Sequence, residues 1–415
     1  MAGERHPPGR RVSRRGGSIV IVFATAFVWL GLSLGVAWLV CSRMPLLAPV
    51  AGGLAVSLLA VYLAVVFFDV PFGSGTDEVV YHTQASGVGR SLLLTGETAS
   101  RYVMLDEGKH GWPTVLGVLY WFSGSTSPYV GLFVNANVTF AALLLSAAAG
   151  QRIYPASRPG PWHVMLLVAS PTVLFLGVSL LRDPLAWLAI ALSVHALLVL
   201  LRSRAALGAA VLLLACLLAF WLRAPLAVII VAASVGALMV IPAYRRWGVG
   251  GAMITMLAAF LAGLQVLVPL LAAAGYSPSL LLIARDYLAT ISTTGFIARD
   301  PFTPVGMVEA LVRVGVGPFP WEYAPAAVWA WVLGNHLYWL AVLALAVLAI
   351  RRYGMDLPRM ALLAFCTVLL AGIAVGLTNY GIVVRMRGSL IIAALPLAWG
   401  ALPLVTARTS REGRS

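Results

Sequence analysis

Two adjacent carboxylates, Asp77 and Glu78, stand in the stretch GTDEVVYHTQA at residues 75–85, between two long apolar segments. A carboxylate beside a hydroxyl group can accept its proton and so activate the oxygen as a nucleophile. Glu78 can orient that acceptor, steady the surroundings of Asp77 or hold a cation. Tyr81 follows Asp77 by one helical turn. The pair is a candidate site for general-base chemistry, and its alternative interpretation is a solvated acidic loop.

Cations that could bind an anion form the second candidate set. Lys109 is the single lysine, against 27 arginines, and His110 follows it. Arginine makes bidentate contacts to phosphate oxygens, and cations stabilise a phosphate whose charge grows as it leaves. The Arg182–Asp183 pair either belongs to such a site or serves as interfacial anchor and N-cap. The arginines expected on the same side of the membrane as Asp77 are Arg182, Arg223, Arg285, Arg299, Arg313, Arg385 and Arg387.

Composition decides the class of protein. The chain is 61% hydrophobic and only 10% charged, and apolar runs of roughly 20 residues recur, each long enough to cross a bilayer. We therefore expect an all-α, polytopic transmembrane bundle. Its three cysteines lie inside apolar runs and show no metal or disulfide spacing. The net charge of +14 comes from arginines between the runs, a pattern that orients membrane proteins, so nucleic-acid binding is not expected.

The apolar runs predict about 11 spans in one domain, residues 18–407, with a disordered basic tail at 1–17 and a cytoplasmic tail at 408–415. The segment 112–123 is too short to cross and is predicted to be an interfacial helix in the first long outer loop, with Trp112, Tyr120 and Trp121 at headgroup depth. The predicted spans are 18–41, 46–68, 128–150, 162–180, 184–201, 206–223, 225–243, 249–273, 325–350, 360–377 and 389–406.

The arginine-rich loops predict the orientation of these spans. From the middle of the chain onward every second loop carries arginine, which places these loops inside by the positive-inside rule. The loops 69–127, 274–324 and 378–388 are then outside, and Asp77 lies at the outer face. The arginines of the N-terminal tail oppose this arrangement, because two spans before residue 69 carry the tail outside too.

The order of motifs resembles the C-type glycosyltransferase superfamily, multispanning enzymes that use polyprenyl-phosphate sugars and include protein O-mannosyltransferase-like and aminoarabinose-transferase-like families. DEVVYHTQA resembles the first outer loop of these enzymes. KHGWPTVLGVLYWFSG, VASPTVLF and SLLRDPLAW follow in the expected order at 109–124, 168–175 and 179–187. The match covers about residues 69–245. Gly-Trp-Pro replaces the usual proline pair, and an additional N-terminal span precedes the motif.

The resemblance implies sugar transfer from a polyprenyl phosphate to an envelope glycan, lipid or protein, at the outer face of a bacterial plasma membrane. A single displacement would invert the anomeric centre. Mg²⁺ or Mn²⁺ remains an open requirement, because two carboxylates do not define a metal site. Alternatives are a polymerase or ligase acting on diphosphate-linked oligosaccharides and a transporter or flippase for lipid-linked saccharides. The residues implied in catalysis are Asp77 and Glu78, and those implied in substrate binding are Tyr81, Lys109, His110, Arg182, Asp183, Arg285, Arg385 and Arg387.

The membrane side of residue 77 tests this topology. We expect a cysteine introduced at position 76 or 80 to react in intact cells with a thiol reagent that cannot cross the membrane. Reaction only after permeabilisation would place Asp77 inside and end the outer-face mechanism.

Overall fold

The structure is a computed structural model that describes residues 30–31, 33–68, 76–95, 111–202, 205–273, 299–317, 319, 326–376 and 380–402. Within these ranges it is helical and contains no strand. The prediction of an all-α, multi-pass membrane protein is confirmed, whereas the count of about 11 spans is not. Eight helices of the described chain are long and apolar enough to cross a membrane, namely Pro45–Phe67, Pro128–Ile153, Asp183–Leu200, Ala205–Leu222, Ala224–Thr255, Val332–Tyr353, Leu357–Val375 and Val383–Ala401.

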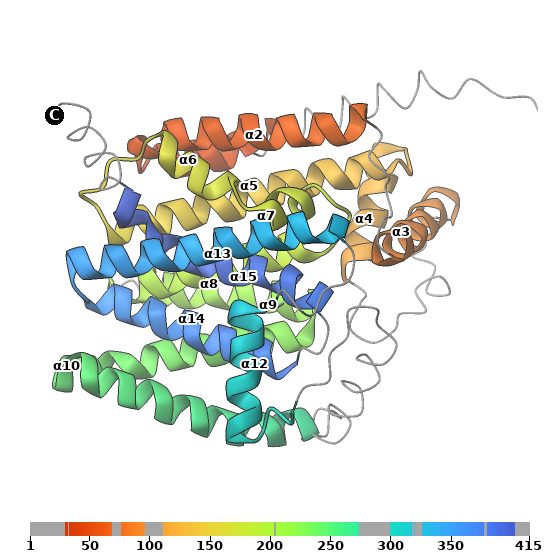
Figure 1. Ribbon diagram of the computed structural model, residues 1–415. Helices are drawn as coiled ribbons and strands as arrows, with labels where there is room; N and C mark the ends of the chain where they lie inside the picture. The colour runs from red at the N-terminus through yellow and green to blue at the C-terminus, as the bar shows by residue number, and fades with distance from the viewer. Residues whose placement is uncertain are drawn as a thin grey trace, which may run out of the picture.

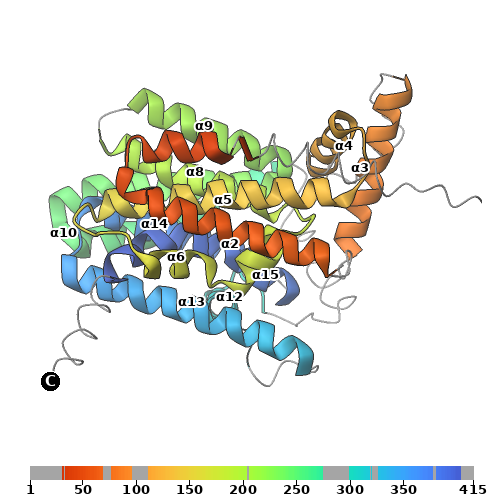
Figure 2. The same ribbon diagram turned by 90° about the horizontal axis from the view of Figure 1, so that it is seen from above.

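The long helices lie side by side and form one bundle (Figure 1). Two helices of the first long loop, α3 (Thr76–Thr95) and α4 (Gly111–Ser123), lie together at one end of it, while α12 (Pro304–Val316) runs across the long helices (Figures 1 and 2). The bundle itself comprises α2 (Ala48–Phe67, preceded by η1, Pro45–Leu47), α5 (Pro128–Ile153), α8 (Asp183–Leu200), α9 (Ala205–Leu222), α10 (Ala224–Ala273), α13 (Ala326–Tyr353), α14 (Leu357–Val375) and α15 (Tyr380–Ala398, followed by η3, Trp399–Ala401).

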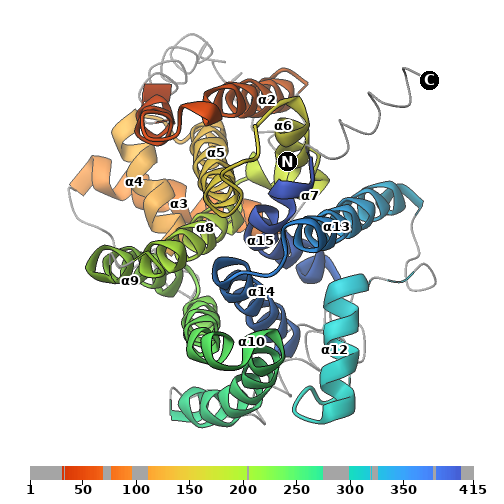
Figure 3. The ribbon, with the colours of Figure 1, turned by 90° about the vertical axis from the view of Figure 1, so that its left-hand side faces the viewer.

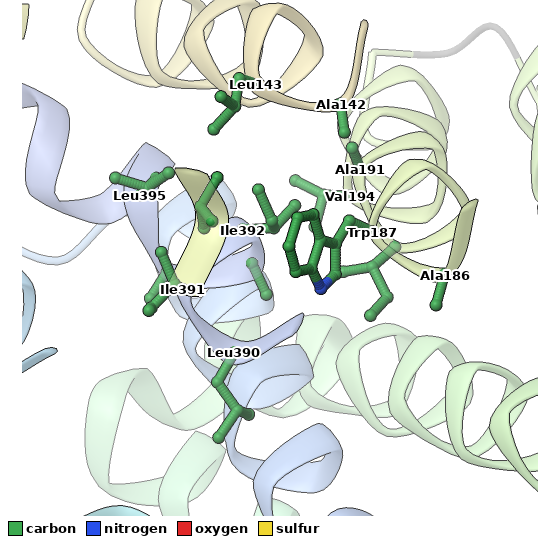
Figure 4. Packing of buried hydrophobic residues seen from close by; sticks show 14 of the residues in the cluster. Ala142, Leu143, Ala186, Trp187, Ala191, Val194, Leu390, Ile391, Ile392 and Leu395 are labelled. Carbon is green, nitrogen blue, oxygen red and sulfur yellow. The ribbon is translucent and has the colours of Figure 1, made fainter. Parts of the chain in front are cut away.

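Helix α15 occupies the centre of the bundle, between α5, α8, α13 and α14 (Figure 3). In the most apolar stretch of α15, 94% of the residues are buried within the protein. The corresponding share in α9 is 22%, and the exposed leucines and phenylalanine of α9 suit contact with lipid. Trp187 of α8 packs against α15 on the side of Ile392 (Figure 4). A Cβ atom at Gly388 would lie 2.7 Å from the Trp187 ring, so only glycine permits this close approach. The contact fixes α15 against α8.

The predicted continuous span over 162–180 is wrong. The chain forms two short helices there, α6 (Pro161–Val168) and α7 (Pro171–Gly177). Pro171 has no amide hydrogen to donate to the preceding turn, so a helix ends before it. The Ser170 side chain then accepts a hydrogen bond from the Val173 amide and starts the next helix. The Ser-Pro dipeptide therefore acts as a stop and a new start.

Between α7 and α8 the chain is non-helical yet buried, from Val178 to Arg182. Buried carbonyl groups need donors, and side chains from distant helices supply them. Asn135 of α5 donates to the carbonyl oxygens of Ser179 at 2.5 Å and Leu181 at 2.7 Å, and the Trp112 indole of α4 donates to Leu180 at 2.6 Å. This loop carries the chain into Arg182 and Asp183, so these donors determine where that pair lies.

The residues predicted to lie at headgroup depth behave differently from one another. Trp112 and Tyr120 are fully buried in protein, and Trp121 alone is exposed among the three. The short helix itself is present as α4. Trp112 and Tyr120 thus serve packing and hydrogen bonding within the protein.

At the end of the bundle opposite to α3 and α4, arginines tie the chain together. The Arg359 guanidinium lies 4.7 Å from the Tyr154 ring centroid and donates to the carbonyl oxygens of Tyr353 and Gly354. Arg202 donates to the carbonyl oxygen of Arg152. Gly248, at φ 68°, breaks the helical geometry of α10 beside Arg245 and Arg246, so the two arms of α10 meet at this end as well.

Replacement of Asn135 by leucine tests the support of the buried loop. The change keeps the size of the side chain but leaves two buried carbonyl groups without a donor, at roughly 1–3 kcal/mol for each unsatisfied group. We expect the free energy of unfolding in detergent to fall by about 2–6 kcal/mol. Asn137→Leu is the matched control, because Asn137 donates to the Phe133 carbonyl oxygen within its own helix. Equal stability of the two variants would contradict the proposed support.

Candidate functional site

The guanidinium group of Arg385 joins three helices at one end of the bundle. Its Nη1 donates to Asp77 Oδ2 of α3 at 2.9 Å, and its Nη2 donates to Asp183 Oδ2 of α8 at 2.8 Å. A third hydrogen bond of 3.3 Å runs from Nε to the same Asp183 oxygen. Residues 308 and 202 positions apart in the chain are thus brought into one charge cluster.

The two carboxylates of this cluster differ in exposure. The side chain of Asp183 is 4% exposed and that of Arg385 is 19% exposed, whereas that of Asp77 is 49% exposed. Asp183 lies in the first turn of α8, where the positive end of the helix dipole favours a negative charge. No side chain caps the start of α8, so the Asp183 carboxylate serves Arg385 and the N-cap interpretation is wrong. Asp183 anchors the arginine, and Asp77 is the carboxylate that a substrate can reach.

Glu78 is buried and holds α3 in place. It is 9% exposed, and its Oε1 accepts a hydrogen bond of 3.0 Å from the Leu180 amide in the buried loop. At the α3–α4 crossing, a Cβ atom at Gly117 would lie 2.6 Å from Val88, so the two backbones approach closely. The His82 Nδ1 atom lies 2.9 Å from the Tyr120 hydroxyl oxygen and ties the same two helices together. These contacts orient the start of α3, and with it Asp77.

Two further arginines lie next to this cluster. Arg182 precedes Asp183 and donates from Nη1 to the Leu222 carbonyl oxygen at 3.0 Å. Arg223 follows Leu222 at the corner between α9 and α10. Burial, followed by repulsion from Arg182, lowers the pKa of Arg223 to about 10. Tyr81 is buried within electrostatic range of Asp77 and the arginines, and burial raises the pKa of its hydroxyl group.

Arg387 lies apart from this cluster, on the opposite face of α15. The helix begins at Tyr380, so the predicted outer corner at 378–388 is wrong and both arginines sit inside the helix. Two residues along a helix turn the side chain by about 200°. Arg387 is fully buried and donates to the carbonyl oxygens of Val314, at 3.1 Å, and Gly317 at the end of α12. Its Nη1 lies 3.2 Å from His336 Nδ1.

The structure therefore brings together five of the ten predicted site residues, with Glu78 beside them and Arg387 turned away. Arg223 and Met386 also belong to the cluster. Arg223 had a sequence signal, as an arginine expected outside, whereas Met386 had none. Lys109, His110 and Arg285 lie outside the described residues. The five residues that converge are Asp77, Tyr81, Arg182, Asp183 and Arg385.

The carboxylate pair does not form a joint cation site in this arrangement, because Glu78 bonds the Leu180 amide while Asp77 bonds Arg385. In the described part of the chain no group of three or more His, Cys, Asp or Glu side chains could hold a metal ion. The side chains around Asp77 in the described ranges thus fit Mg²⁺ or Mn²⁺ poorly.

In comparisons with known proteins, no family model, curated protein or solved structure matches this chain. The chemistry of the site must be argued from its geometry. The half-exposed Asp77 carboxylate bonds Arg385, and Arg182 and Arg223 lie in the same cluster. Charges at the ends of apolar helices are costly unless they face water or an opposite charge. Such a cluster can accept a proton at Asp77 and stabilise an anion at the arginines.

Separate replacement of Asp183 and Asp77 by asparagine tests the two assigned roles, Asp183 as the anchor of Arg385 and Asp77 as the carboxylate that a substrate can reach. Asp183→Asn leaves Arg385 buried with its closest counter-charge removed, a loss of about 3–5 kcal/mol for broken buried pairs. Asp77→Asn removes a half-exposed partner, and we expect a change of about 1 kcal/mol or less. Thermal unfolding in one detergent measures both. Equal destabilisation by the two variants would contradict the assigned roles.

Proposed function

We propose that the protein is a membrane glycosyltransferase that moves a sugar from a polyprenyl phosphate to a hydroxyl acceptor. The acceptor is an envelope glycan, lipid or protein at the outer face of a bacterial plasma membrane. One observation carries the proposal: the half-exposed carboxylate of Asp77 is bonded to Arg385 and lies in a cluster with Arg182 and Arg223. A transferase of this class needs a base and a group of cations side by side.

Asp77 is the base in this proposal. Its Oδ2 accepts from Arg385, and almost half of its side chain is exposed, so an acceptor hydroxyl group can approach it. Asp183 and Glu78 are buried and hold Arg385 and the Leu180 amide respectively. Their function is to position the other groups.

The bond changes are those of a single displacement. The acceptor oxygen attacks the anomeric carbon while its proton passes to Asp77. The bond from the anomeric carbon to the phosphate oxygen breaks, and its electron pair stays on the phosphate. The arginines stabilise the charge that accumulates there. Attack from the face opposite to the phosphate inverts the anomeric configuration.

Charge placement favours a transferase over a transporter. Secondary transporters place ionisable groups near the midplane of the bilayer, on broken helices. Here the cluster unites the starts of α3, α8 and α10 with the first turns of α15, which are helix ends. A polymerase or ligase acting on diphosphate-linked oligosaccharides would use the same arginines, so the donor must be identified by assay.

Asp77→Asn tests the proposal. Purified protein in liposomes is incubated with a panel of polyprenyl-phosphate hexoses and pentoses and membrane-derived acceptors, and released polyprenyl phosphate is measured by mass spectrometry. We expect wild-type release and a loss of about 10²-fold or more in Asp77→Asn, the contribution typical of a general base. Glu78→Gln is the matched control and loses less, because the amide oxygen still accepts from Leu180.

Near-normal turnover in Asp77→Asn would exclude Asp77 as the base. Movement of the saccharide lipid across the bilayer without cleavage of its phosphate bond would favour the flippase alternative. Turnover with diphosphate-linked oligosaccharides alone would favour the polymerase or ligase.

A further inference from the structure

Arg223 has a weaker partner than its neighbours have. Its Nη1 contacts the Met386 thioether sulfur at 3.7 Å, and a thioether is a weak hydrogen-bond acceptor. Among the described residues no carboxylate lies within ion-pair distance of Arg223; Asp183 attracts it from farther away. Arg385, one residue from Met386, is by contrast bonded to two carboxylates. Arg223 is thus a partly buried cation that can accept an anionic partner.

A small cleft brings Arg223 and Arg182 together. Its walls come from the start of α8, the corner between α9 and α10, and α15, through Asp183, Leu222 and Met386 among others. Two guanidinium groups repel one another in a partly buried site, where charges are poorly screened. The positive ends of the α8 and α10 dipoles lie at the same place. Asp183 in the same wall attracts both arginines, but its Oδ2 atom is bonded to Arg385. A second anion, placed between Arg182 and Arg223, would relieve the remaining repulsion.

The cleft is small, and Met386 lines it. Its free volume is about 10 Å³, room for roughly one water molecule. Met386 is 8% exposed and supplies the wall that α15 contributes. A methionine side chain has three rotatable bonds and adapts readily to a changed surrounding. A rotamer change at Met386 would release the sulfur from Arg223 and open the space beside it.

We infer that this cleft is a phosphate subsite, in which Arg182 and Arg223 hold the phosphate ester of the lipid-linked donor and Met386 is the placeholder that the phosphate displaces. The inference rests on the proposed function, since that supplies the anion. It separates two roles that sequence alone merges: Arg385 positions Asp77, and Arg182 with Arg223 binds phosphate. The sugar then lies between the cleft and Asp77, within reach of the acceptor.

Binding of geranyl phosphate to the full-length protein in detergent tests the subsite, with inorganic phosphate as the second probe. We expect Arg223→Gln to raise the Kd for geranyl phosphate about tenfold or more, the loss typical of a charge-assisted hydrogen bond. Arg299→Gln is the matched control, because it removes the same charge from a side chain that is 70% exposed. Met386→Ala should lower the Kd by opening the cleft.

Each outcome has a defined meaning. Unchanged affinity in Arg223→Gln, with thermal unfolding as in wild type, would refute the subsite. An equal loss in Arg299→Gln would also refute it, by showing general charge attraction. Weaker binding in Met386→Ala would refute the placeholder. If Arg223→Gln weakens the binding of both probes equally, the subsite recognises free phosphate. If only the binding of geranyl phosphate weakens, the subsite recognises a lipid phosphate.

The subsite and the proposed transfer can fail separately. Normal binding of geranyl phosphate in Asp77→Asn, together with normal turnover, would remove the catalytic assignment and leave the subsite standing. Loss of turnover in Asp77→Asn, with no effect of Arg223→Gln on binding, would remove the subsite and leave the catalytic assignment standing.

Discussion

The buried ion pair between Asp183 and Arg385 is the constraint on which the rest of the structure depends. Two charges removed from water remain stable only in close mutual contact, because the loss of either partner leaves an uncompensated charge. The 2.8 Å contact therefore fixes the start of α8 against the first turns of α15. Gly388 and Trp187, packed together one turn farther along, maintain the same spacing between the helices. Asp77 joins a pair that is already fixed.

Helix α15 is held from both sides by arginines of unlike function. Arg385 bonds carboxylates at the site, while Arg387 bonds the final carbonyl groups of α12 and approaches His336 of α13. The carbonyl end of a helix carries a partial negative charge, so a cation there is favourable. Rotation of α15 would break both sets of contacts at once. Helix α12 and the candidate site are thus connected through α15.

The sequence predicts the long apolar helices well, because span length and apolar content follow directly from the bilayer. It also predicts that Asp77, Arg182, Asp183 and Arg385 belong together. It misses the residues that support them, since Asn135 bonds carbonyl groups 44 and 46 positions away and Trp112 bonds one 68 positions away. Those partners are available because α7 ends at Gly177 and leaves a buried non-helical stretch from Val178 to Arg182. Helix ends are equally hard to predict, and the early start of α15 turned Arg387 away from the site.

Charge balance within the cluster bears on the proposed reaction. Two carboxylates, Asp77 and Asp183, stand against Arg182, Arg223 and Arg385, so these five ionised side chains leave one net positive charge. In the proposed reaction the phosphate gains one negative charge as its bond breaks, and Asp77 loses one as it takes the acceptor proton. The negative charge facing the arginines is therefore the same before and after transfer and moves only from Asp77 toward the cleft. Arg385 beside Asp77, together with Arg182 and Arg223 in the cleft, can stabilise both ends of that movement without reorganisation of the surrounding helices.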